Sequence, residues 1–365
     1  RYGARHESTT CARNQRQRVT SGAQVVDSCL APYRHRKLLW RRTTARMSTP
    51  PAASPPSPRA TRAVLALLLV TVLWGWTFVW MKQATDAASE KLGPGGLTAG
   101  IGLFMALRFG LAAIAMLALP SVRNGLTRGA WVAGLWIGLA LLGGFLLQMF
   151  GLSGVSPAVS AFLTSLYVLF TALLTAVRNR RAPHAALLAG ALLATFGAGF
   201  IGGPPQLTFG VAEGLTIGCA FVFAVHILVT DAYTKREAPM PVTMTSFVVV
   251  ALGGALTCAI GALLEPQTSA AQLVELAQTA EFLTPMLLAS GLATVLALSL
   301  MNVFQRELDP VRAAIIYAIE PIWAALVSIT LGRETTTPWL FIGGAALLLG
   351  NLVAELGPTL LRRRS

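Results

Sequence analysis

Long stretches of apolar residues fill this chain of 365 residues from Ala63 almost to its end. The longest, residues 129–177, runs for 49 residues without Lys, Arg, Asp, Glu or His. As one helix it would be about 74 Å long at ~1.5 Å per residue, whereas the hydrocarbon core of a bilayer is about 30 Å thick. The stretch must therefore fold back on itself. We expect the turn at residues 151–157, which are rich in residues that end or begin helices.

The composition excludes an ordinary soluble domain. Hydrophobic residues make up 54% of the chain and charged residues 12%, against roughly 25% charged in soluble domains. Of the net charge of +14, residues 1–58 hold +9, from eleven Lys/Arg and two acidic residues, and the remainder holds +5. The basic residues of this remainder fall in short loops, which indicates a lipid bilayer rather than nucleic acid as partner. The four cysteines show no metal-binding spacing, so we expect no disulfide, metal or cofactor.

The N-terminal residues differ from the rest of the chain. Residues 1–60 are predicted to form a disordered basic arm, because they lack periodicity and end in a stretch dense in Pro and Ser. The sequence begins with Arg1, and Met47 directly precedes that stretch. We hypothesise that translation begins at Met47 and that residues 1–46 are absent from the native protein, with a genuine arm as the alternative. Residues 358–365 are expected to form a basic cytoplasmic tail.

Hydropathy predicts an all-α membrane protein with ten transmembrane helices. Their expected ranges are 63–81, 98–119, 130–150, 156–177, 184–203, 213–231, 242–264, 282–304, 312–331 and 338–356. With the N-terminus inside, the inner segments after residue 58 hold fourteen Lys/Arg and the outer loops hold three. This bias places both termini in the cytoplasm of a multi-pass protein of the inner (plasma) membrane.

An internal repeat underlies these spans. Three pairs of residues are each 153 positions apart: Pro157 and Pro310, Gly190 and Gly343, and Gly197 and Gly350. The offset divides the chain into two five-helix halves, residues 61–205 and 206–357. Because five is odd, the second half enters the membrane from the opposite side. Such inverted repeats are typical of secondary transporters, whose substrates bind near the midplane between the halves.

Six segments carry recognisable motifs: Leu73–Val79, Leu107–Phe109, Gln148–Leu152 with Ser156–Ala158, Leu308–Ala314, Tyr317–Pro321 and Gly332–Glu334. Together they resemble the EamA-type transporters of the drug/metabolite transporter superfamily. The resemblance covers about residues 62–357. It implies ten helices in two inverted five-helix repeats and export of small metabolites or drugs across the inner membrane. It does not imply a particular substrate.

Two charged residues fall deep within predicted spans, where each charge costs at least about 2.5–3.5 kcal/mol. Glu320 is a candidate proton carrier, or it accepts hydrogen bonds from backbone exposed beside Pro321. Arg108 is expected either to bind an anionic group of a substrate or to neutralise Glu320 within the bundle. His226 is the other candidate proton carrier, with a hydrogen-bonded residue of the bundle as the alternative.

The remaining candidates are uncharged polar or aromatic residues within the spans. Together with the three ionisable groups they form the expected substrate pathway: Trp74, Arg108, Gln148, Tyr167, His226, Asn302, Tyr317 and Glu320. The 153-residue offset relates Tyr167 to Glu320, so the two are expected at matching depth.

These observations favour a secondary transporter that moves a small polar or amphipathic solute by alternating access. Efflux is favoured through the resemblance alone. No Walker loop follows any span, so we expect an ion gradient rather than ATP to supply any driving energy. We expect no enzymatic activity. An integral membrane enzyme acting on lipid and a non-transporting membrane scaffold remain the alternatives, and a homodimer stays open.

Overall fold

The computed structural model describes residues 58–180, 182, 184–200, 204, 210–308 and 316–362. Residues 1–57, 181, 183, 201–203, 205–209, 309–315 and 363–365 lie outside this description, and with them most of the predicted N-terminal arm. Within it the chain forms helices and no strands. The elements are α1 (Pro58–Leu92), α2 (Leu97–Leu117), α3 (Pro120–Arg123), α4 (Arg128–Gly154), α5 (Pro157–Thr164), α6 (Tyr167–Arg178), α7 (Ala185–Phe200), α8 (Val211–Thr234), α9 (Pro239–Leu264), α10 (Ala270–Gln278), α11 (Ala280–Leu288), η1 (Ala289–Leu296), α12 (Ala297–Phe304), η2 (Gln305–Glu307), α14 (Glu320–Thr330) and α15 (Pro338–Arg362).

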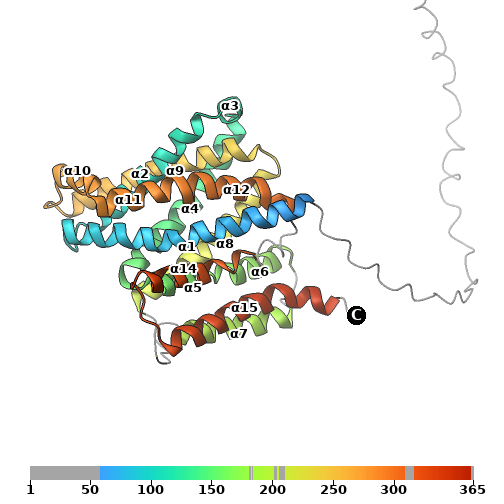
Figure 1. The fold of residues 1–365 in the computed structure, drawn as a ribbon. Helices are drawn as coiled ribbons and strands as arrows, with labels where there is room; N and C mark the ends of the chain where they lie inside the picture. The colour runs from blue at the N-terminus through green and yellow to red at the C-terminus, as the bar shows by residue number, and fades with distance from the viewer. Residues whose placement is uncertain are drawn as a thin grey trace, which may run out of the picture. The chain divides into compact units, whose positions relative to one another are not determined.

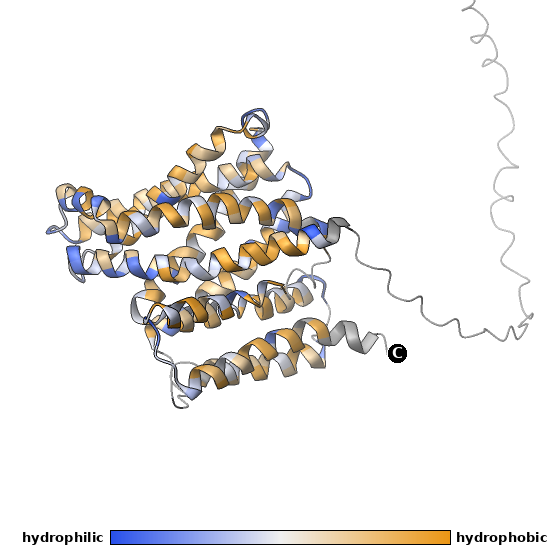
Figure 2. Ribbon diagram, in the orientation of Figure 1, coloured by the Kyte–Doolittle hydropathy of each residue, from blue (hydrophilic) through white to orange (hydrophobic). Residues whose placement is uncertain are grey.

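Seven helical segments are long and apolar enough to cross a membrane. They are α1, α2, α4, α5 joined to α6, α8, α9, and α11 continued through η1 and α12. α7 and α15 contain shorter apolar stretches, and α14 follows the undescribed residues 309–315. Figure 2 shows apolar residues along all of these helices, with polar residues gathered at their ends. The all-helical membrane fold is confirmed, while the count of ten spans stays a prediction.

The first helix is longer than its predicted span. α1 continues from the expected end at residue 81 to Leu92, and its 35 residues correspond to about 52 Å of helix. The added turns contain good helix formers and an i,i+4 ion pair between Lys82 and Asp86. The helix ends before Gly93, whose φ of 73° lies in the left-handed region that glycine adopts most readily.

α2 and α9 pack closely against each other although they come from different halves of the chain (Figure 1). A Cβ on Gly102 would lie 2.2 Å from the backbone nitrogen of Cys258. Reciprocally, a Cβ on Gly254 would lie 2.6 Å from the backbone nitrogen of Ala106. Gly254 lies 152 residues after Gly102, and Cys258 lies 152 residues after Ala106. The second contact is therefore the repeat copy of the first. A contact that repeats itself with the partners exchanged is expected of two elements related by a twofold axis.

α7 and α15 form a second reciprocal crossing, visible as the neighbouring pair at the bottom of Figure 1. A Cβ on Gly190 would lie 2.5 Å from the carbonyl oxygen of Gly350, and one on Gly197 would lie 2.6 Å from that of Gly343. Each glycine thus meets the repeat equivalent of the other. Small residues allow such close approach where lipid offers no hydrophobic driving force between helices. Both crossings agree with two halves of inverted orientation.

The predicted fourth and ninth spans each contain a tight turn, at positions that are equivalent in the two repeats. The backbone N–H of Leu166 donates to the carbonyl of Leu163 at 3.2 Å, and that of Ile319 donates to Ile316 at 3.1 Å. Both donors and both acceptors are 153 residues apart, as the repeat requires. These i→i−3 bonds form tight turns, after which α6 begins at Tyr167 and α14 begins at Glu320.

The two interruptions have different local causes. Pro321 occupies the first turn of α14, where its missing N–H costs little, and its ring disfavours a helix running straight through. The earlier break has no proline. There the hydroxyl of Ser165 donates to the carbonyl of Phe162 at 2.6 Å, and the amide of Asn351 on α15 donates to Ser165. These bonds substitute for the interrupted helical ones.

Candidate substrate pathway

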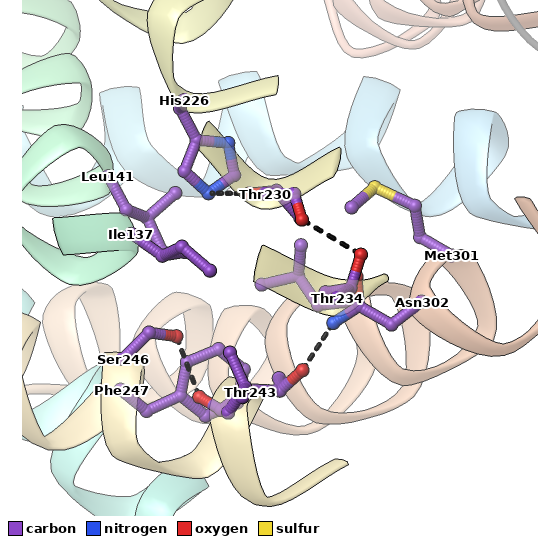
Figure 3. Close-up of a pocket in the computed structure, with 12 residues that line it drawn as sticks. Ile137, Leu141, His226, Thr230, Thr234, Thr243, Ser246, Phe247, Met301 and Asn302 are labelled. Atoms are coloured by element: carbon purple, nitrogen blue, oxygen red, sulfur yellow. Dashed lines mark hydrogen bonds between the residues drawn. The ribbon is translucent and has the colours of Figure 1, made fainter. Parts of the chain in front are cut away.

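A small pocket with mixed walls lies between α4, α8, α9 and α12, and it is called the polar pocket here after its hydroxyl, amide and imidazole groups (Figure 3). Its volume of about 20 Å³ is enough for a water molecule but not for a metabolite. It is lined by Ile137, Leu141, His226, Thr230, Thr234, Val242, Thr243, Ser246, Phe247, Leu298, Met301 and Asn302. Two predicted pathway residues, His226 and Asn302, therefore share one pocket although 76 residues separate them.

The polar groups of the pocket are hydroxyls, an amide and an imidazole. His226 Nε2 and Thr230 Oγ1 are 3.4 Å apart, one helical turn from each other on α8. The amide nitrogen of Asn302 donates to Thr243 Oγ1, which connects α12 to α9. Thr234 donates to the carbonyl of Thr230 at 2.8 Å. This lining suits neutral hydrogen-bonding groups of a solute, because no Asp, Glu, Lys or Arg side chain contributes to it.

Glu320 begins α14 directly after the tight turn at Ile319, and it is buried beside aromatic side chains. Tyr167 and Tyr317 are both close enough to interact electrostatically with its carboxylate. The ring of Tyr317 lies 5.8 Å from that of Trp74, and its hydroxyl donates to Gln305 Oε1 at 3.0 Å. Four of the predicted pathway residues are thus neighbours: Trp74 of α1, Tyr167 of α6, Tyr317 just before α14, and Glu320 at the start of α14.

A short polar chain lies beside this cluster. The Gln148 amide on α4 donates to Thr164 Oγ1 at the end of α5, at 3.3 Å. Thr164 Oγ1 in turn lies 3.8 Å from Cys219 Sγ on α8, and Cys219 also interacts electrostatically with Glu320. The chain connects Gln148 to the neighbourhood of Glu320 through buried groups.

Arg108 is held against a wide, π-helical turn. Its Nε donates to Thr294 Oγ1 at 2.8 Å, and its carbonyl accepts a hydrogen bond from Ser290 at 2.8 Å. Both partners belong to η1, a π-helix, and such segments often occur at functional sites. The indole of Trp74 donates to Ala293 in the same turn at 3.2 Å. Trp74 therefore joins the surroundings of Arg108 to those of Glu320.

The structure does not pair Arg108 with Glu320. The ion pairs found in the described part of the chain involve other residues, so the expected neutralisation of Glu320 by Arg108 finds no support. Among the same residues, the Glu320 carboxylate also accepts no hydrogen bond from the backbone beside Pro321. Glu320 and Pro321 lie in the first turn of α14.

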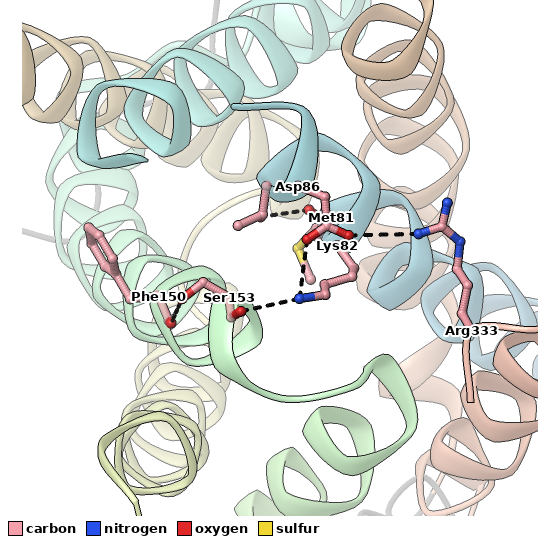
Figure 4. Close-up of polar contacts among 7 residues, drawn as sticks. Met81, Lys82, Asp86, Phe150, Ser153 and Arg333 are labelled. Atoms are coloured by element: carbon pink, nitrogen blue, oxygen red, sulfur yellow. Dashed lines mark hydrogen bonds and ion pairs between the residues drawn. The ribbon is translucent and has the colours of Figure 1, made fainter. Parts of the chain in front are cut away.

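The opposite end of the bundle is joined by charged groups (Figure 4). Lys82 Nζ lies 3.2 Å from Asp86 and also donates to the carbonyl of Ser153 at the end of α4, at 3.2 Å. Arg333, in the loop after α14, lies 3.8 Å from Asp86. Ser153 and the pocket residue Ile137 lie on the same helix, 16 residues or about 24 Å apart. The pocket and this charged cluster therefore lie at different ends.

Glu334, next to Arg333, is a half-buried carboxylate in this region. Burial raises the pKa of the Glu334 carboxyl above its usual value, against the effect of hydrogen bonds from the Ser156 side chain and the Ala158 backbone, which lower it. A raised pKa means that the folded state disfavours the charged form. The cost of this burial is present above the folded-state pKa and is relieved as the pH falls through it.

We therefore expect Glu334→Gln to change the pH dependence of stability. The melting temperature of the wild type, relative to that of Glu334→Gln, should rise by about 1–2 °C between pH 8 and pH 5, a small effect because solvent screens a half-exposed group. Thermal unfolding of both proteins in the same detergent measures this difference. Glu90→Gln, at an exposed position of α1, serves as the control. A difference that falls with acidification would contradict the assignment.

Sequence reasoning missed the hydroxyl partners of the pathway. They are Thr164, Thr230, Thr243, Ser290 and Thr294. Only Thr230 had a usable signal, since it lies four residues after His226 and shares its helix face. The others face predicted residues from different helices, and the sequence gives no sign of which helices are neighbours.

Comparisons with known proteins agree with this architecture. Residues 61–203 and 211–355 each match the EamA-like transporter family. An uncharacterized transporter of Archaeoglobus fulgidus is 25% identical over 295 residues, which cover 80% of this chain and 86% of the relative. A protein solved by crystallography shares 20% sequence identity with a TM-score of 0.52, over 80% of this chain and 98% of its own. That likeness supports the fold alone.

The two family matches divide the chain close to the predicted boundary between its halves, at residues 205 and 206. They cover the described helices of both repeats, including all eight residues of the expected pathway. The chain therefore belongs to the EamA-like transporter family, within the drug/metabolite transporter superfamily.

Proposed function

We propose that this protein is a secondary transporter that exports a small solute across the inner membrane by alternating access. The observation that carries this proposal is the pair of interrupted helices, α5–α6 and α14, at equivalent positions of the two repeats. Interrupted helices at the interface of inverted repeats are where transporters bind substrates and coupling ions. Here Tyr167 and Glu320 begin the second segments and interact electrostatically.

In this proposal the polar pocket is the closed remnant of the cytoplasmic entrance. The loop beside it contains Lys235 and Arg236, and basic residues favour the cytoplasmic side. The cluster of Lys82, Asp86 and Arg333 then closes the external side. Opening that side requires the α14–α15 loop to separate from α1, while the entrance side stays closed.

Glu320 is proposed as the proton carrier that couples export to an ion gradient. It is buried, it begins α14, and it takes part in no ion pair among the described residues. Protonation of its carboxylate and release of the proton would alternate with solute binding. His226, in the pocket wall, is the other candidate and would act nearer the entrance.

Filling the pocket tests the proposal. We expect Thr234→Trp to reduce uptake of the solute into inside-out membrane vesicles at least tenfold, because an indole exceeds the available space. The solute is identified by incubating vesicles with and without the protein in a metabolite mixture and measuring their contents by mass spectrometry.

Leu256→Trp is the matched control, since Leu256 on α9 is 62% exposed on the surface of the bundle. It should leave uptake unchanged. If wild-type vesicles accumulate no more of any metabolite than vesicles lacking the protein, the transporter proposal is wrong. If both tryptophan variants transport normally, the pocket is not on the solute's path.

A further inference from the structure

The guanidinium of Arg108 is enclosed deep in the bundle with part of its hydrogen-bonding capacity unused. The side chain is 1% exposed. Its Nε is satisfied by Thr294, but no acceptor for Nη1 is found among the described residues. A guanidinium presents five N–H donors in a planar fork that matches a carboxylate. A buried donor left unpaired destabilises the folded protein, so this one is available to a ligand.

The charge of Arg108 is also uncompensated by any acid in the described part of the chain, where no ion pair includes it. Two aromatic rings supply the compensation that is present. Arg108 Cζ lies 4.8 Å from the ring centroid of Phe145 and 5.1 Å from that of Phe109. Cation–π contacts of this kind offset only part of the cost of an unpaired charge within a membrane protein.

The site lies one aromatic layer away from the polar pocket. Phe247 lines the pocket, and its ring packs edge-on against Phe109 at 5.6 Å between centroids. On the other side, Thr294 lies one helical turn before Leu298, another residue of the pocket wall. Movement of Phe247 and Phe109 would therefore connect the pocket to the guanidinium.

We propose that Arg108 binds the carboxylate of the transported solute, and that the solute is an organic monoanion with an apolar body. The carboxylate would accept from Nη1, and the apolar body would lie against Phe109 and Phe145. This inference rests on the proposed transport function and adds the substrate class. It also explains why an uncharged pocket lies beside a charged group. The hydroxyls would hydrogen-bond the solute as it enters, and the guanidinium would favour solutes that carry a negative charge.

The test uses three probes of similar shape and different charge: benzoate, benzyl alcohol and benzylamine. Purified protein is placed in nanodiscs of phosphatidylcholine, which carry no net negative charge, and its thermal unfolding is followed with each probe. We expect benzoate to raise the melting temperature in a saturable manner, and benzyl alcohol and benzylamine to have no such effect. Equal stabilisation by benzoate and benzyl alcohol would overturn the inference.

Variants then assign the effect to the guanidinium. Arg108→Gln should abolish the benzoate shift, and Arg108→Lys should weaken benzoate binding at least tenfold, since a lysine keeps the charge but not the planar fork. Arg123→Gln, an exposed arginine outside the pathway, should retain the full shift. An unchanged shift in a folded Arg108→Gln protein would refute the assignment. If that variant does not fold, the comparison of the three probes on the wild type still decides.

Two further outcomes separate this inference from the proposed function. If vesicles export a neutral or cationic metabolite and benzoate does not bind, the transporter stands and the anion site is wrong. If nanodiscs containing phosphatidylglycerol stabilise the protein and abolish the benzoate effect, with Arg108→Gln insensitive to that lipid, Arg108 binds a lipid headgroup and not a solute.

Discussion

Gly102→Ala is expected to lower the free energy of unfolding by about 3 kcal/mol or more, the upper part of the range for overpacked cores. The new Cβ would lie 2.2 Å from the backbone nitrogen of Cys258 and 2.8 Å from the carbonyl oxygen of Gly254. Backbone atoms cannot move aside as the end of a side chain can. The α2–α9 crossing would have to widen, and the contact between the two repeats would weaken.

The repeat gives this prediction an internal check. Gly254→Ala meets the backbone of Ala106 at 2.6 Å and should destabilise the protein to a similar degree. Gly214→Ala on α8 is the matched control, because nothing lies within 4 Å of the added Cβ. Since alanine is the better helix former by up to about 1 kcal/mol, this control should be neutral or slightly stabilising. Unfolding by a denaturing detergent compares the three variants, and equal stability among them would contradict the crossing.

Glu320→Gln is expected to abolish accumulation driven by a pH gradient while leaving the fold intact. Glutamine has nearly the same shape but carries no titrating proton, so the step proposed for Glu320 cannot occur. Coupling to one proton permits about tenfold accumulation per pH unit, equivalent to about 1.4 kcal/mol. The variant should lose this gradient-dependent part and keep exchange of labelled for unlabelled solute across the membrane.

The measurement compares both kinds of flux in proteoliposomes, with the solute that the vesicle screen identifies. His226→Gln is tested in parallel, because it removes the other candidate carrier. If only His226→Gln loses accumulation, His226 in the pocket wall carries the proton and Glu320 does not. Loss of exchange as well as accumulation in a folded Glu320→Gln protein would assign Glu320 to solute binding instead of proton coupling.

The candidate site was only partly accessible from the sequence. Arg108 and Glu320 could be identified because a charge within an apolar span demands a reason. The offset of 153 residues relates Tyr167 to Glu320, and each of them begins a helical segment after a tight turn. Their pairing partners could not be identified, because hydroxyl residues such as Thr294 are common in membrane helices and carry no distinguishing pattern.

The sequence by itself determined the class of the protein, the positions of most helices and the division into two halves, since apolar length, glycine and proline spacing act locally along the chain. Tertiary structure alone decided which groups meet. It separated Arg108 from Glu320, placed Arg108 against the π-helical turn, and brought His226 and Asn302 to one pocket. The physical reason is that helix neighbours are selected by close packing at glycine crossings, and the register of each crossing depends on the shape of both surfaces.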